Sequence, residues 1–143
     1  MHSATMEVFA PTIEKTGQWI DDVMAETGWD SRRAYSALRA VLHVLRDRLT
    51  HGEAVDLGAQ LPMLVRGLYY EGWQPAKQPL KYRHKADFLE RFSEHYPGLE
   101  EDQRDLAVRA VFKLLARHVT GGEIEHIKNQ LPAEIRELWK TAL

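Results

Sequence analysis

The residues with the clearest metal-binding pattern lie near the end of the chain. Glu123 and His126 are three positions apart, a Glu-x-x-His spacing that places a carboxylate and an imidazole on one face of a helix. His118 lies one turn before the same helix and could supply a third ligand. A di-iron carboxylate site needs two such motifs and two further carboxylates, and the chain contains a single motif. We therefore predict no metal and no cofactor, and Glu123, His126 and His118 are the candidates if a metal is bound.

A second group of residues suited to binding surrounds the middle of the chain. Residues 71–86 carry a net charge of +3, and aromatic residues lie among the basic ones. This mixture is typical of surfaces that bind single-stranded nucleic acid by stacking and phosphate contacts. However, the whole chain has a net charge of −2, which argues against nucleic acid as a partner. The pattern favours a strap that lays Trp73 and Pro75 between two helical units. The candidate ligand- or partner-binding residues are Tyr69, Tyr70, Trp73, Lys77, Lys81, Tyr82 and Arg83.

Catalytic motifs are missing from the sequence. The chain has no cysteine, which excludes a cysteine nucleophile, a Cys-ligated zinc site and a disulfide scaffold. It also has no Gly-x-Ser-x-Gly elbow, no phosphate-binding glycine loop and no dinucleotide fingerprint. The histidines are scattered, and His43 is expected to be solvated on the polar face of its helix. We therefore predict that the protein is not an enzyme.

The elements that position these residues repeat along the chain at an offset of 70. Residues 39–70 align with residues 109–140, and twelve of the aligned positions are identical. The identities include a Thr-x-Gly-Glu corner and a Gln-Leu-Pro block in each copy. We predict two tandem helical repeats, residues 10–72 and 86–143, joined by a connector at residues 73–85.

Each repeat is expected to contain four helices. Apolar residues recur with a period of 3.6 in both copies, and no segment alternates with period 2. Thr50 with Glu53, and Thr120 with Glu123, have the spacing of a capping box, in which the Glu side chain reaches back to the Thr amide. The expected fold class is all-α, with about eight helices in two four-helix pseudo-repeats packed into one compact body. The apolar positions of the longest stripes are Leu38, Val41, Leu42, Leu45 and Leu49, and Val108, Val111, Phe112, Leu115 and Val119.

Several blocks occur together in an order that is characteristic of one family. The RAVLxxLxxRL stripe, the T-x-G-E corner, the QLPxxxRxLY block and the GWxPxxxPLK connector resemble an uncharacterised bacterial family, domain of unknown function 2267. The resemblance covers roughly residues 12–141. It implies an all-helical fold with an internal duplication, and it supplies no catalytic residues.

Composition and organisation together favour a non-enzymatic protein-interaction or adaptor module that can self-associate, with an unidentified protein as partner. The alternative is a small-ligand or metal-binding helical protein with a pocket near the connector. A deep apolar cavity with converging polar groups would favour the alternative, and a shallow apolar surface patch would favour the interaction module. No apolar run approaches the roughly 20 residues of a membrane span, and no signal segment is recognisable. We therefore expect a cytoplasmic protein without membrane contact.

Overall fold

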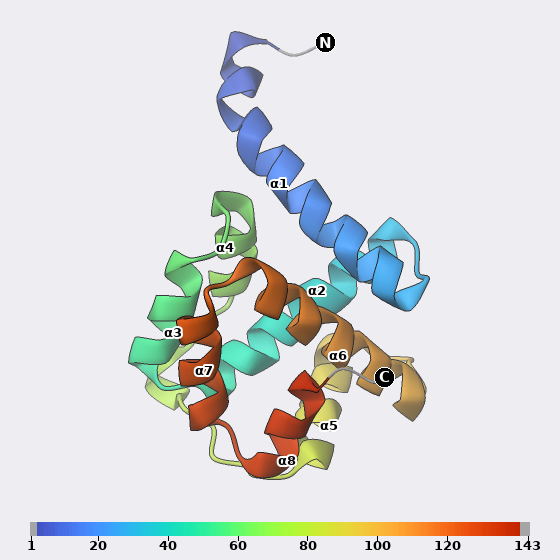
Figure 1. The fold of residues 1–143 in the computed structure, drawn as a ribbon, viewed down its shortest axis with the longest axis vertical. Coiled ribbons are helices and arrows are strands. Elements are labelled where there is room, and N and C mark those ends of the chain that lie inside the picture. Colours follow the sequence, from blue (N-terminus) through green and yellow to red (C-terminus); the bar gives the residue numbers. More distant parts are fainter. Residues whose placement is uncertain (1–2, 141–143) are drawn as a thin grey trace.

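The computed structural model describes residues 3–140, and in this range the chain forms helices and no strand (Figure 1). The prediction of an all-α fold with about eight helices is confirmed. No helix in this range has a stretch that is both long and apolar enough to cross a bilayer. The α-helices are α1 (Ala4–Thr27), α2 (Ser31–Arg48), α3 (His51–Ala59), α4 (Met63–Tyr70), α5 (Lys85–His95), α6 (Glu101–His118), α7 (Gly121–Gln130) and α8 (Ala133–Arg136), with short 3-10 helices at Pro75–Lys77 and Glu137–Trp139.

Local signals in the sequence explain where the helices begin and end. Asp30 caps α2, and its side chain accepts a hydrogen bond from the amide of Arg33 at 2.9 Å. Gly28 ends α1 in the left-handed conformation, with φ of 75°, which a residue without Cβ adopts at little cost. α6 begins with a capping box formed by Glu100 and Gln103.

The helix bounds in the two halves of the chain match closely. Adding 70 to the bounds of α2 gives the bounds of α6, and α3 and α7 begin one residue after Thr50 and Thr120. Pro62 and Pro132 occupy the N-cap positions of α4 and α8. These matches support the predicted tandem repeats and their boundaries, which stay a prediction.

A single core joins the two halves. α2 and α6 contact each other, and α1 packs against both (Figure 1). The apolar stripes predicted on these helices are buried and belong to one continuous cluster, and Phe88 and Phe92 of α5 extend it. The shared face stabilises both halves, because a unit of about 60 residues alone buries too little surface to be more than marginally stable.

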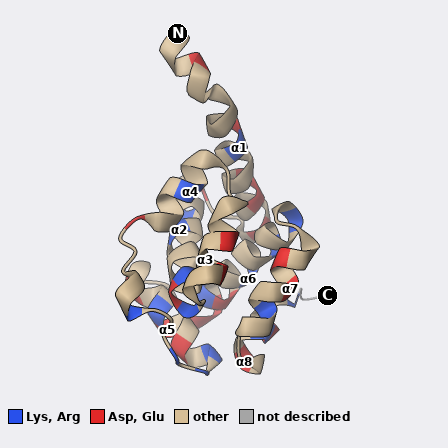
Figure 2. Cartoon of the chain, turned by 90° about the vertical axis from the view of Figure 1, so that its left-hand side faces the viewer, with Lys and Arg blue, Asp and Glu red and all other residues tan. Residues whose placement is uncertain are grey.

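The first half of α1 extends beyond this core (Figures 1 and 2). The second half packs on the body through Trp19 and Val23, which are buried. The helix begins at Ala4, six residues before the predicted start of the first repeat. Met6, Phe9 and Ile13 on the projecting half are 45%, 45% and 47% exposed.

Candidate functional site

The connector between the two halves is fastened to the end of α2. The indole nitrogen of Trp73 donates to the side-chain oxygen of Gln78. The side-chain nitrogen of Gln78, Nε2, donates in turn to the backbone carbonyls of Arg46, at 2.6 Å, and Leu49, at 2.8 Å. Trp73 is half-buried, whereas Pro75 is exposed. The contacts of Trp73 are with Tyr70, His51 and Gln78, so the connector is fastened to the first half of the chain, and the insertion of Trp73 and Pro75 between the two helical units stays a prediction.

The other aromatic candidates near the connector are held by their own chain. Tyr69 is fully buried, its hydroxyl donates to the carbonyl of Ala54 at 2.7 Å, and burial raises the pKa of this hydroxyl. The ring of Tyr70 lies 5.3 Å from that of Trp73. Tyr82 is half-buried, with the guanidinium groups of Arg48 and Arg91 5.6 and 5.4 Å from its ring centre. Each of these rings is at least partly buried and packs against other side chains of the same chain.

The basic candidates of the connector lie on the surface. Lys77, Lys81 and Arg83 are exposed. Lys77 lines a small pocket of about 200 Å³ together with Asp47 and Arg91. Sites for drug-sized ligands usually have volumes of roughly 300–1,000 Å³ and mainly apolar walls. The pocket at Lys77 is therefore smaller than the usual site for such a ligand.

The structure does not place His118 with the other two metal candidates. Its Nε2 lies 2.8 Å from Oδ2 of Asp22 on α1, and its ring stacks on Trp19 at 5.1 Å. His118 thereby links the end of α6 to α1.

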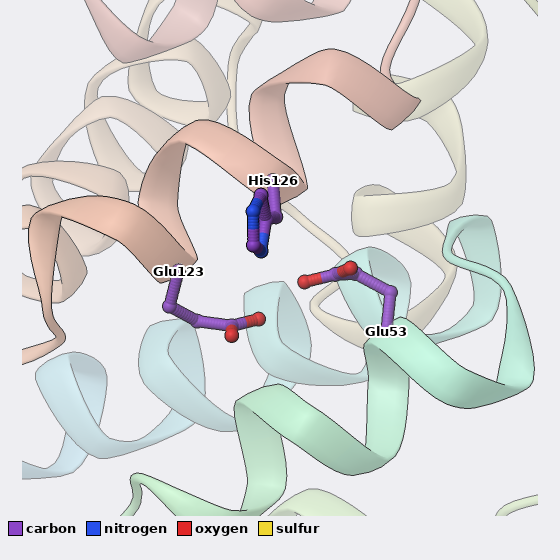
Figure 3. A group of neighbouring side chains, drawn as sticks. All are labelled: Glu53, Glu123 and His126. Carbon is purple, nitrogen blue, oxygen red and sulfur yellow. The ribbon is translucent and has the colours of Figure 1, made fainter.

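Glu123 and His126 instead meet a glutamate from the first half of the chain. Glu53 of α3 and Glu123 of α7 point toward each other across the contact between these helices, and His126 lies beside them (Figure 3). One ligand atom from each of the three side chains lies within 4.8 Å of the other two. Glu53 and Glu123 are only 8% and 9% exposed, whereas His126 is exposed. The sequence motif identifies the Glu-x-x-His half of this cluster but does not identify Glu53 as its partner.

The capping boxes predicted at Thr50 and Thr120 form only in part. Both Thr hydroxyls accept from the amide of the Glu three residues later, as predicted. The side chains of Glu53 and Glu123 do not accept from the amides of Thr50 and Thr120, so that part of the prediction is wrong. The amide of Thr50 donates to Oε1 of Gln130 at 3.1 Å, and the amide of Thr120 donates to Oε1 of Gln60 at 2.9 Å.

This exchange across the α3–α7 contact leaves the two carboxylates facing each other. Oε1 of Glu53 and Oε1 of Glu123 are buried and have no hydrogen-bond partner. Between residues 3 and 140, neither glutamate forms an ion pair with a basic side chain. Burial, a hydrogen bond with Glu53, and the charges of Glu53 and Asp56 raise the pKa of Glu123 to about 8. The pair can hold a proton or a cation.

The expectation that His43 is solvated is wrong. His43 is 3% exposed, and its Nε2 lies 2.6 Å from the carbonyl oxygen of Leu68. Burial lowers its pKa. The reason is that α4 covers this side of α2, so a face that is polar in sequence becomes internal.

A further feature that the sequence predictions omit is the apolar face of the projecting half of α1. We define the α1 stripe as Met6, Phe9 and Ile13, which are spaced by three and four residues. The same alternation continues through Thr16, Ile20 and Val23. This heptad spacing is the signal that could have identified the stripe.

Together, these features define a class of all-helical protein in which α3 and α7 place two buried carboxylates against each other. The family model for an uncharacterized conserved protein, DUF2267, matches residues 16–138, and the chain belongs to this family. A search of curated proteins finds no match. The α1 stripe precedes the matched region.

Proposed function

We propose that this protein is a non-catalytic helical interaction module that associates with a second copy of itself through the α1 stripe. The observation that supports this function is the exposure of Met6, Phe9 and Ile13 on one face of a helix that extends from the core. Contiguous exposed apolar residues are a recurrent feature of protein–protein interfaces. The proposal places this association in the cytoplasm, in keeping with a chain that contains no cysteine.

The α1 stripe continues a face that the protein already uses for helix–helix contact. Farther along the same face, Ile20 and Val23 pack against the body of the protein, where α1 contacts α2 and α6. The projecting half alone is too short to be more than marginally stable as a helix in water, and Pro11 within it removes a backbone donor. A second helix lying on the stripe would supply the burial that this half lacks.

The residues beside the stripe suit a second copy of the same helix. In an antiparallel pair, Phe9 of one copy would lie opposite Ile13 of the other, with both in core positions of the heptad. Such a pairing is self-complementary, as a two-fold symmetric interface requires. The positions that border the stripe are small and uncharged, so two helices can approach closely without repulsion between like charges; they are Thr5, Ala10, Thr12 and Gly17.

The beginning of α4 widens this apolar surface. Met63 and Leu64 are 63% and 45% exposed. The amide of Leu64 donates to the hydroxyl of Thr12 at 3.1 Å, which places the start of α4 against α1. A second copy that lies along α1 would therefore cover apolar side chains from two helices.

Sedimentation velocity over a range of concentrations tests the proposed function. The wild-type chain is expected to form a dimer in reversible equilibrium with the monomer. Ile13→Glu should weaken the dimer by at least about 100-fold, since each of two copies loses about 2 kcal/mol of apolar burial. Lys15→Glu, a charge change away from the stripe, should leave the equilibrium within about threefold of wild type. A wild-type chain that stays monomeric at several hundred micromolar, or equal effects of the two substitutions, would contradict the proposal.

A further inference from the structure

We infer that Glu53, Glu123 and His126 form a binding site for a divalent transition-metal ion at the contact between α3 and α7. The two carboxylates come from different halves of the chain, and the imidazole comes from the turn after Glu123 (Figure 3). The site is remote in sequence from the α1 stripe, and the inference is independent of self-association.

The separations of the ligand atoms fit a common ion after a small adjustment. Carboxylate oxygens and imidazole nitrogens bind such ions at about 2.0–2.2 Å, which places neighbouring ligand atoms roughly 3–4 Å apart. In the structure, one atom from each side chain lies within 4.8 Å of the other two. His126 is exposed, so a change of its rotamer can bring its ring nitrogen closer to the two carboxylates.

Burial of the carboxylates is an independent observation that points to a ligand. Glu53 and Glu123 are each more than nine-tenths buried, and the Oε1 atom of each has no hydrogen-bond partner. The side-chain amide of Gln130 lies 3.5 Å from Oε2 of Glu53, at the limit of a hydrogen bond. Buried carboxylates with so few donors and no counter-charge are rare in folded proteins, because removing them from water is costly. A divalent cation between them would neutralise both.

The ligand types select the class of ion. An imidazole beside two carboxylates suits Zn²⁺, Mn²⁺ or Fe²⁺, whereas Mg²⁺ and Ca²⁺ prefer oxygen ligands alone. Three protein ligands leave at least one position for water. Asp56 on α3 adds negative charge near Glu123, which strengthens the attraction for a cation. A single proton shared by the two carboxylates is the competing occupant.

Titration calorimetry with zinc sulfate tests the site in the full chain, purified without a histidine tag and freed of metal with a chelator. Wild type is expected to bind one Zn²⁺ per chain with micromolar or tighter affinity, and millimolar Mg²⁺ should not compete. Glu123→Gln and His126→Ala should each weaken binding by more than about tenfold, since even outer-shell partners contribute that much. Glu125→Gln, on the same helix with a side chain 65% exposed, is the matched control and should bind like wild type.

Two outcomes would overturn the inference. One is the absence of saturable binding at millimolar Zn²⁺. The other is a wild-type affinity that His126→Ala leaves unchanged, which would assign the binding to other surface histidines. Because His126 is exposed, this variant should keep its fold even if Glu123→Gln does not, and far-UV circular dichroism checks both.

Discussion

Replacing Arg46 by methionine is expected to lower the free energy of unfolding by about 3–5 kcal/mol, the usual effect of removing one partner from a buried charged network. The Arg46 side chain is 4% exposed. Its Nη1 donates to the carbonyls of Tyr69, at 2.7 Å, and Glu71, at 2.9 Å, and its Nε donates to Asp47 at 2.8 Å. Methionine fills a similar volume but leaves the carbonyls at the end of α4 without donors. Urea unfolding followed by circular dichroism measures the loss.

Arg39→Met is the matched control for this substitution. Arg39 lies on the same helix and contacts the Glu71 side chain at 2.7 Å, but the two side chains are 37% and 56% exposed. Exposed ion pairs contribute no more than about 1 kcal/mol, so this variant should unfold close to wild type. Equal losses for Arg46→Met and Arg39→Met would show that Arg46 does not anchor the end of α4.

The metal-free protein is expected to become less stable as the pH rises from about 5 to 8. Burial, with the hydrogen bond and charge of Glu53, raises the pKa of Glu123 from its ordinary value of 4.5 to about 8. Between these values the folded chain keeps a proton that the unfolded chain has released. Stability from this proton is fully present below pH 4.5 and is lost as the pH rises through 8, with a slope of at most about 1.4 kcal/mol per pH unit. Chemical unfolding at a series of pH values measures the slope.

Glu53→Gln isolates this contribution. Without the charge of Glu53, the pKa of Glu123 should fall, and the slope should flatten. His43 acts in the opposite direction, because burial lowers its pKa and the folded state gains stability as this imidazole loses its proton. Subtracting the pH profile of Glu53→Gln from that of wild type removes the contribution of His43, because both chains contain this histidine. Parallel pH profiles for the two chains would contradict a contribution of Glu53 to the raised pKa of Glu123.

The fold could be predicted largely from sequence, because its determinants are local. Asp30 and the threonines at positions 50 and 120 cap helices in the structure as their sequence context predicts. The apolar periodicity of α2 and α6 fixes which faces enter the core. His43 was misplaced, because the pattern of one helix does not show which neighbouring helices will cover its polar side.

The carboxylate pair could not be predicted, because it depends on contacts between distant segments. Gln60 accepts from the amide of Thr120, 60 residues away, and Gln130 accepts from the amide of Thr50, 80 residues away. These glutamines take the place of the glutamates in the two caps. A capping-box motif is therefore ambiguous when another side chain can reach the same amide. The alignment of residues 39–70 with residues 109–140 contained one clue, since it placed Glu53 and Glu123 at equivalent positions, but their contact required the arrangement of α3 against α7.

Disulfide trapping at the α1 stripe tests the proposed self-association most directly, because the wild-type chain contains no cysteine. Phe9→Cys and Ile13→Cys chains are mixed in equal amounts and oxidised with glutathione, with Glu7→Cys, which lies off the stripe on α1, as the control. The antiparallel pairing predicts that the mixed 9–13 disulfide dominates over 9–9 and 13–13 products, because only the mixed pair brings the two Cα atoms within the roughly 4.4–6.8 Å that a disulfide spans. A yield of covalent dimer no higher than that of the Glu7→Cys control would contradict self-association through the α1 stripe.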